Sequence, residues 1–239
     1  MKSISDEMHE QDQSAETVLI LRTCNADMTS HRGFIWPEAG PVEDPDWKQT
    51  PNCGYGLHGL LFGEGNGSLL NWRADARWLV VEVDATSVVN IGGKVKFPRG
   101  VVVHCGDRQS ATSYLAARTH GRAIVGGTAT AGYGGTATAG DGGTATAGDG
   151  GTATAGYGGT ATAGYGGTAT AGDRGTATAG YGGTATAGYG GILSLRWWDG
   201  KRYRIATFCL GEDGIEPNIP YRCEEGRAVK VSLPDMNSE

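Results

Sequence analysis

The sequence predicts a mainly β protein built around a short β-solenoid, and two observations lead to that prediction. First, residues 126–191 carry eight near-identical copies of the octapeptide Gly-Gly-Thr-Ala-Thr-Ala-Gly-(Tyr or Asp). A period this strict is the signature of a repeat architecture. Second, threonine and alanine alternate within every copy. On a strand, that alternation puts both threonines on one face and the alanines on the other.

Each octapeptide is expected to supply one strand and one turn. Threonine is β-branched and suits a strand, whereas the glycines suit the turns. Eight residues are short for a closed coil, so we expect about four coils of sixteen residues, with Ala129, Ala137, Ala145 and their equivalents inside. The alternative is a disordered spacer rich in Gly, Ala and Thr. The strict period and the alternation favour the solenoid.

The outward threonines should form a regular grid. Its spacing would be ~6.6–6.8 Å along a strand and ~4.7–4.9 Å between neighbouring strands. Such a grid suits a partner that is itself regular, either another copy of the protein or a crystal lattice such as ice. The expected binding surface consists of Thr128, Thr130, Thr136, Thr138, Thr144, Thr146, Thr152, Thr154, Thr160, Thr162, Thr168, Thr170, Thr176, Thr178, Thr184 and Thr186.

The last octapeptide position mixes tyrosine and aspartate. Taken in alternate copies, one column reads Tyr133, Asp149, Tyr165, Tyr181 and the other reads Asp141, Tyr157, Asp173, Tyr189. Neither column is therefore a pure tyrosine ladder.

The segment Ala-Gly-Tyr-Gly-Gly-Thr-Ala-Thr at residues 131–138 resembles the octapeptide of bacterial ice nucleation proteins. That resemblance implies a β-solenoid whose Thr-x-Thr rows order water. This chain departs from the family pattern, which alternates two different octapeptides, keeps one tyrosine column and runs far longer. Four coils give a face only ~14 Å tall. We therefore expect weak ice binding or inhibition of ice growth rather than nucleation.

The flanking segments are expected to cap the solenoid, because a bare β edge invites polymerisation. We expect a disordered acidic tail over residues 1–16, an α+β amino-terminal cap domain over 17–122, the solenoid over 123–191, a β-hairpin carboxy-terminal cap over 192–234 and a tail over 235–239.

Within the caps, the pattern predicts several strands and one helix. Residues 25–73 are expected to be mostly loop, and a type I′ turn is expected at Asp199-Gly200. The expected strands cover residues 17–24, 78–84, 88–91, 94–97, 101–105, 192–198, 201–209 and 228–233, and the helix covers 110–118.

The segment Cys53-Gly54-Tyr55-Gly56-Leu57-His58-Gly59 resembles the Cys-x-x-Gly-Phe-His-Ala motif of an uncharacterised bacterial and phage domain. That domain often precedes short Ala/Thr/Gly repeats, and here the resemblance covers residues 18–122. It implies no known activity and transfers no catalytic residue. His58 is the one candidate site residue of this domain, and we favour a structural histidine in a tight loop. A nucleotide-binding cleft formed by Arg22, His31, His58 and Glu82 is the competing interpretation.

The remaining features exclude several classes of function. Cys53 with His58, or His104 with Cys105, offers too few ligands for a metal site, and no cofactor is expected. A net charge of −6 without a basic patch argues against nucleic acid. The five cysteines, the polar amino terminus and the lack of a long apolar run predict a cytoplasmic protein without membrane insertion.

We therefore expect a non-enzymatic protein that binds ice or ordered water, or associates with itself, through its solenoid. The alternative is a rigid repeat stalk that carries an enzyme or toxin-like amino-terminal domain.

Overall fold

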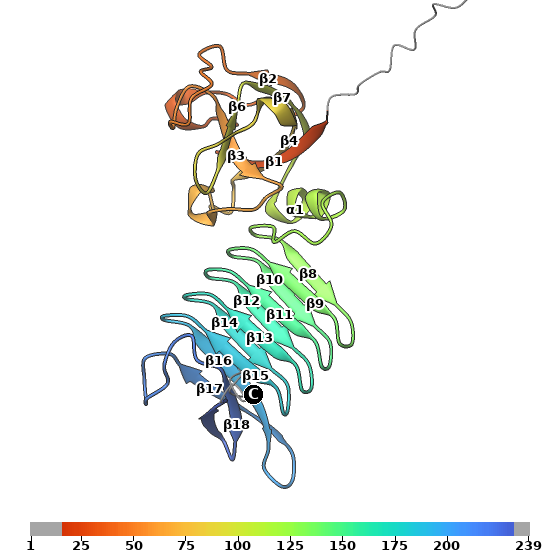
Figure 1. The fold of residues 1–239 in the computed structure, drawn as a ribbon, viewed down its shortest axis with the longest axis vertical. Coiled ribbons are helices and arrows are strands. Elements are labelled where there is room, and N and C mark those ends of the chain that lie inside the picture. Colours follow the sequence, from red (N-terminus) through yellow and green to blue (C-terminus); the bar gives the residue numbers. More distant parts are fainter. Residues whose placement is uncertain (1–15, 232–239) are drawn as a thin grey trace, which may run out of the picture.

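The computed structural model describes residues 16–231, which form three units stacked along one axis (Figure 1). A seven-stranded amino-terminal sheet comes first, the solenoid follows, and four strands close the far end. The predicted mainly β architecture, with a solenoid between an α+β unit and a β cap, is confirmed. Apart from Glu16, the tails expected at residues 1–16 and 235–239 lie outside the described residues.

The amino-terminal sheet is antiparallel throughout and has the order β2-β7-β4-β1-β3-β6-β5. One face packs on an apolar core around Ile20, Trp36 and Phe97, and the other packs against α1. The elements are β1 (Thr17–Cys24), β2 (Gly40–Glu43), β3 (Leu57–Leu61), β4 (Arg77–Asp84), β5 (Val89–Asn90), β6 (Val95–Phe97), β7 (Arg99–Gly106) and α1 (Arg108–Ala116), with single 3-10 turns at His31–Gly33, Gly67–Leu69 and Ala85–Ser87.

Residues 25–73 are mostly loop, as expected, but they contain two strands that the sequence did not predict, namely β2 at the edge of the sheet and β3 between β1 and β6. The sequence did not predict β3 because this strand contains Gly59, and glycine is unfavourable within strands. Gly59 is required here by close approach to β1: a Cβ atom would lie 2.4 Å from Ile20 Cγ2 and 2.6 Å from the Leu21 carbonyl oxygen. A strand glycine of this kind marks backbone contact rather than a loop.

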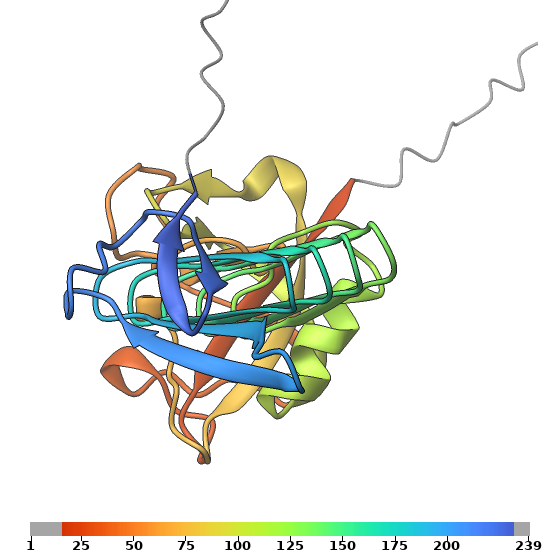
Figure 2. The ribbon, with the colours of Figure 1, turned by 90° about the horizontal axis from the view of Figure 1, so that it is seen from below.

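The eight octapeptides form two parallel sheets, and each coil contributes one strand to each sheet (Figures 1 and 2). Partners are sixteen residues apart, as in the pairing of Thr144 with Thr128, so the four sixteen-residue coils are confirmed. The first sheet holds β8 (Thr128–Ala131), β10 (Thr144–Ala147), β12 (Thr160–Ala163) and β14 (Thr176–Ala179), and the second holds β9 (Thr136–Ala139), β11 (Thr152–Ala155), β13 (Thr168–Ala171) and β15 (Thr184–Ala187).

Alanine alone fills the interior of the coils. From Ala137 to Ala187 every inward alanine is at most 4% exposed, whereas Ala129 and Ala131 of the first coil are half-buried. The two sheets are therefore close, and the turns are equally tight. At Gly180 a Cβ atom would lie 2.5 Å from the Gly164 carbonyl oxygen of the preceding coil. Side chains larger than alanine have no space inside this array.

Aspartates at the last octapeptide position join successive coils. One oxygen of Asp141 accepts a hydrogen bond from the Tyr157 amide at 2.9 Å. Asp149 and Asp173 bind the amides of Tyr165 and Tyr189 in the same way, each at 2.8 Å. In each case the aspartate lies one coil before a tyrosine in the same column. The Tyr/Asp mixture therefore has a structural role that the sequence did not reveal.

Replacing Asp149 with alanine should lower the free energy of unfolding by about 1 kcal/mol, the usual net contribution of one hydrogen bond. Asp149→Asn keeps a carbonyl acceptor and should lose less. Thermal unfolding followed by circular dichroism measures both variants. An Asp149→Ala protein that melts with the wild type would show that this bond adds nothing to stability.

The carboxy-terminal cap continues both sheets. β16 (Ile192–Trp198) pairs in parallel with β14, and β17 (Tyr203–Cys209) pairs with β16. β18 (Tyr221–Glu224) joins β15 through the pair Ala185 and Tyr221, and β19 (Arg227–Lys230) completes a second hairpin. The expected single hairpin with a last strand at 228–233 is thus incomplete, because β18 was missed. Leu193, Leu195 and Tyr221 are at most 2% exposed and close the alanine interior.

The turn between β16 and β17 differs from the expected type I′ turn. Such a turn needs positive φ at both central residues. Here the Asp199 amide bonds to the Arg202 carbonyl, so Gly200 and Lys201 are central, and of these two only Gly200 has positive φ, at +91°. The Asp199 carboxylate accepts from the amides of Lys201 and Arg202, each at 2.8 Å. The turn is therefore held by this side chain.

Candidate functional site

The sixteen predicted threonines form two grids, one on each sheet. In both sheets threonine pairs with threonine and alanine with alanine through all four coils. The strand geometry gives each grid spacings of ~6.6–6.8 Å along the strands and ~4.7–4.9 Å between them.

In the four middle copies the first threonine of the triplet is exposed and the second is half-buried. The first threonines are exposed from the first copy to the sixth, and only Thr176 and Thr184, beside the cap, are half-buried. The second threonines are exposed at Thr130 and Thr138 and half-buried in the other six copies. Each grid therefore presents alternating rows of different accessibility, with methyl and hydroxyl groups toward the solvent.

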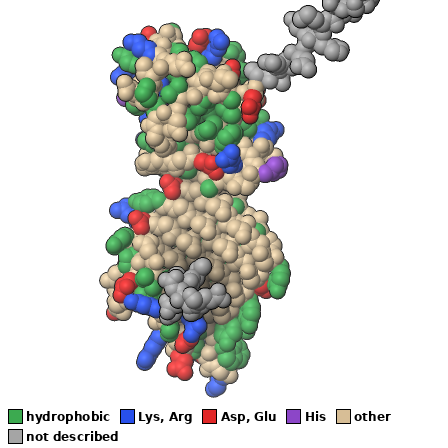
Figure 3. All heavy atoms as spheres, viewed as in Figure 1, with side chains coloured by type: hydrophobic (Ala, Val, Ile, Leu, Met, Phe, Trp, Pro, Cys, Tyr) green, Lys and Arg blue, Asp and Glu red, His purple; other side chains and the backbone are tan. Residues whose placement is uncertain are grey.

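Both grids are uncharged. The eight strands contain only threonine and alanine, and the charged residues of the array, Asp141, Asp149, Asp173 and Arg174, lie at its turns. In Figure 3 the solenoid face that is seen is a broad area without acidic or basic side chains. Such a surface offers regular hydrogen-bonding groups with no strongly hydrated ion among them.

One position of the first grid was missed from the sequence. β16 pairs Ile192 with Thr176 and Ser194 with Thr178, so Ser194 continues the row of second threonines into the cap. The signal was present, because Ile192 begins eight residues after Thr184 and keeps the repeat phase.

Aromatic side chains line one edge of the array. The rings of Tyr165 and Tyr181 are 5.8 Å apart, and those of Tyr181 and Tyr203 are 5.5 Å apart. Trp198 extends this row, 5.0 Å from Tyr203. A partial ladder thus forms in one column and continues into the cap, although Asp149 interrupts it.

His58 lies on β3 rather than in the tight loop that the sequence predicted, and its ring contacts the loop that precedes this strand. Its Nε2 atom accepts from the Gly54 amide at 3.4 Å, and the Cys53 Sγ atom is 3.9 Å away. Cys53 and His58, considered together from the sequence, are thus neighbours, but two side chains are too few ligands for a metal site. Burial, and then the positive charges of Lys94, Arg22 and Lys96, lower the pKa of His58 to about 4. The ring is therefore neutral at pH 7.

The predicted group of Arg22, His31, His58 and Glu82 is only partly assembled. Arg22, His31 and His58 line one hollow together, but Glu82 lies on β4 beside Arg99, in another hollow. Strand alternation explains the separation, because Glu82 faces solvent between the buried Val81 and Val83. The nucleotide cleft postulated from these four residues is therefore not formed.

The side chains of the other histidine–cysteine pair, His104 and Cys105, contact different partners and form no common site. His104 Nε2 lies 3.1 Å from Ser110 Oγ, whereas Arg77 Nη2 approaches Cys105 Sγ at 3.5 Å. Within residues 16–231, no three His, Cys, Asp or Glu side chains are grouped as a metal site requires.

The fold and its two grids define a β-solenoid repeat protein with uncharged threonine faces. Curated relatives of this chain carry the name ice nucleation protein. The Pseudomonas syringae protein is 46% identical over 105 residues, which is 43% of this chain and 9% of that protein. The Xanthomonas campestris pv. translucens protein is 46% identical over 104 residues (43% and 7%), and InaU of Pantoea ananas is 46% identical over 102 residues (42% and 10%).

The similarity to ice nucleation proteins expected from the repeats is thus confirmed. The chain spans about a tenth or less of the length of the relatives named here. The match of 105 residues is longer than the 66 residues of segment 126–191, so it is not confined to the repeats.

The amino-terminal domain matches a family described as "Domain of unknown function (DUF7666)" over residues 18–115. The expected resemblance to an uncharacterised domain is confirmed. No solved structure matches the chain. Among the described residues, no helix has the length and apolar character needed to cross a bilayer.

Proposed function

We propose that this protein binds ice or ice-like ordered water through its threonine grids, without enzymatic activity. The observation that carries the proposal is the unbroken register of threonine on threonine through four coils in both sheets. The similarity to proteins named for ice nucleation supports it. A regular array of methyl and hydroxyl groups can hold water molecules at fixed spacings, whereas a mobile charged surface cannot.

The length of the array favours inhibition or shaping of ice growth over nucleation. Four coils give a grid about three strand spacings tall, or ~14 Å. Such a patch is small for templating a new crystal, but it suffices to adsorb to an existing ice surface. We propose that the threonine grids are the ligand-binding site, and that the flanking domains at 17–122 and 192–234 act as caps of a cytoplasmic protein.

Lysine substitutions on one grid at a time test this proposal. Lysine is long, mobile and strongly hydrated, so it should abolish ice shaping by the altered grid. The fold should survive, because the altered side chains point outward, where a strand tolerates such changes at a cost of about 1 kcal/mol each, and salt screens the repulsion between lysines on neighbouring strands. The first-grid variant replaces Thr144, Thr146, Thr160 and Thr162, and the second-grid variant replaces Thr152, Thr154, Thr168 and Thr170.

A matched control adds the same charge away from the grids. It carries lysine at four exposed positions of the amino-terminal domain, namely Gln49, Ala74, Gln109 and Ser113. Ice shaping and freezing temperature report function, circular dichroism reports the fold, and sedimentation reports self-association. A wild-type protein without effect on ice would refute the proposal. Association of wild-type copies that both grid variants lose would instead identify the grids as an assembly surface.

A further inference from the structure

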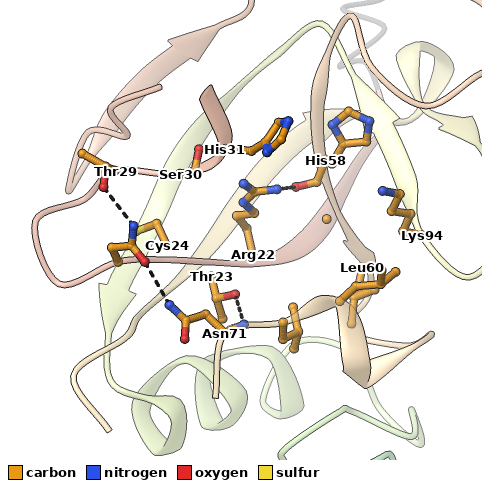
Figure 4. Close-up of a pocket in the computed structure, with 14 residues that line it drawn as sticks. Arg22, Thr23, Cys24, Thr29, Ser30, His31, His58, Leu60, Asn71 and Lys94 are labelled. Atoms are coloured by element: carbon orange, nitrogen blue, oxygen red, sulfur yellow. Dashed lines mark hydrogen bonds between the residues drawn. The ribbon is translucent and has the colours of Figure 1, made fainter. Parts of the chain in front are cut away.

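Two hollows of the amino-terminal domain meet along a row of basic side chains. Their volumes are about 480 and 540 Å³, and Arg22, His31, His58 and Lys94 line both. Figure 4 shows these four side chains around one opening. They come from β1, the 3-10 turn at His31–Gly33, β3 and the turn between β5 and β6. Segments distant in the sequence thus place four nitrogen-bearing groups together.

Arg22 is the half-buried centre of this group. Its Nη1 atom donates to the His58 carbonyl oxygen at 3.0 Å, and its guanidinium lies 5.2 Å from the centre of the Trp36 ring. Its Nε atom is buried without any hydrogen-bond partner, alone among side-chain polar atoms of residues 16–231. Burial lowers the pKa of Arg22. Buried polar groups nearly always have hydrogen-bond partners, so the free Nε–H group indicates that a bound molecule supplies the acceptor.

Within residues 16–231, no carboxylate forms an ion pair with Arg22. The ion pairs of the described part of the chain involve neither it nor His31, His58 or Lys94. The 480 Å³ hollow has no acidic lining residue, although Asp44 and Asp46 line the other hollow. Behind the group, the buried Lys96 ammonium binds the carbonyl oxygens of Asn52 and Gly54 at 2.9 and 3.3 Å, which adds uncompensated charge. Buried charges are normally paired, so the missing negative charge points to a ligand.

We infer that this hollow binds a small molecule through an oxyanion group, a phosphate or a carboxylate, held by Arg22 with Lys94 and His31 beside it. The guanidinium fork matches the oxygen spacing of both groups. Thr29 and Asn71 on the opposite wall can bind the rest of the molecule, and the volume is typical of small-molecule sites. His58 is a positioning residue, because its carbonyl oxygen fixes the guanidinium. This inference does not depend on ice binding.

Nuclear magnetic resonance of the full chain tests the inference directly at the Arg22 Nε–H group. Millimolar inorganic phosphate and acetate are titrated in turn, with sodium chloride at equal ionic strength as the reference. The Arg22 Nε–H and His31 ring resonances should shift and saturate with at least one of the two anions. Lys94→Gln should weaken binding about tenfold, the effect of one charge-assisted hydrogen bond. Arg99→Gln, a change of an exposed arginine on β7, should leave binding unchanged.

Arg22→Gln should abolish saturable binding, and its circular dichroism shows whether the domain still folds. If it does not fold, Lys94→Gln still decides the question. Saturation by phosphate alone would identify a phosphate ester as the ligand class, and saturation by acetate alone a carboxylate. The inference is overturned if neither anion shifts the Arg22 Nε–H resonance beyond the chloride reference, or if Arg99→Gln weakens binding as much as Lys94→Gln.

Discussion

Leucine in place of Ala153 and Ala161 is expected to unfold the repeat array. The two alanines lie in different sheets and are fully buried. The interior offers no room for three extra carbon atoms, because the alanines fill it and the glycine turns lie close to the preceding coil. Overpacking costs about 1–3 kcal/mol per site, and a solenoid transmits the disruption because each coil is stabilised only by its neighbours. Circular dichroism and protease cleavage within residues 126–191 should both report the loss.

The matched control places the same side chain one residue earlier. Thr152→Leu and Thr160→Leu point outward, where strand positions tolerate apolar side chains at a cost of about 1 kcal/mol or less. The control protein should therefore remain folded and resist protease. Equal stability of the two double mutants would contradict the assignment of alanine to a closely packed interior.

The repeat array could be predicted from the sequence because its information is local. Within one octapeptide, the glycines predict the turns and the Thr/Ala alternation predicts which side chains share a face. The strict period extends this prediction to every copy, and two octapeptides make one coil. The outward threonines followed directly from the alternation, since a single change of phase would have put hydroxyl groups inside.

The remaining parts depend on contacts between distant segments, and those were missed. β3 contains Gly59 because β1 approaches it closely, and a glycine at this position made the segment look like a loop in the sequence. β18 is linked to the solenoid by one residue pair, Ala185 with Tyr221, for which neither segment has a pattern. Arg22 and His58 were recognised as candidates, but only the fold shows that their partner is Lys94 rather than Glu82. Local patterns therefore define the grids, whereas the hollow requires tertiary structure.

Truncation after Gly191 is expected to make the chain associate in pairs through its bared strand edges. Without the cap, β14 and β15 lose their partners β16 and β18, and the last alanines lose contact with Leu193, Leu195 and Tyr221. Two unpaired strand edges beside an apolar surface form a template for another copy. Because the amino-terminal domain covers the other end of the array, each truncated chain has one bared end, and two such ends can pair. Sedimentation velocity should show the truncated chain with about twice the mass of one copy, in contrast to the full chain.

A second truncated protein distinguishes pairing of the strand edges from nonspecific association through the exposed apolar surface. It also carries Thr176→Lys and Thr184→Lys, which change only outward positions of the last coil. Pairing of two such ends would bring like charges onto neighbouring strands, which is destabilising, whereas the exposed apolar residues stay the same. We expect this variant to remain dispersed at low salt and to assemble as salt screens the lysines. Association of both truncated proteins at low salt would implicate the apolar surface alone, and a truncated chain that sediments as a folded monomer would show that the solenoid needs no cap.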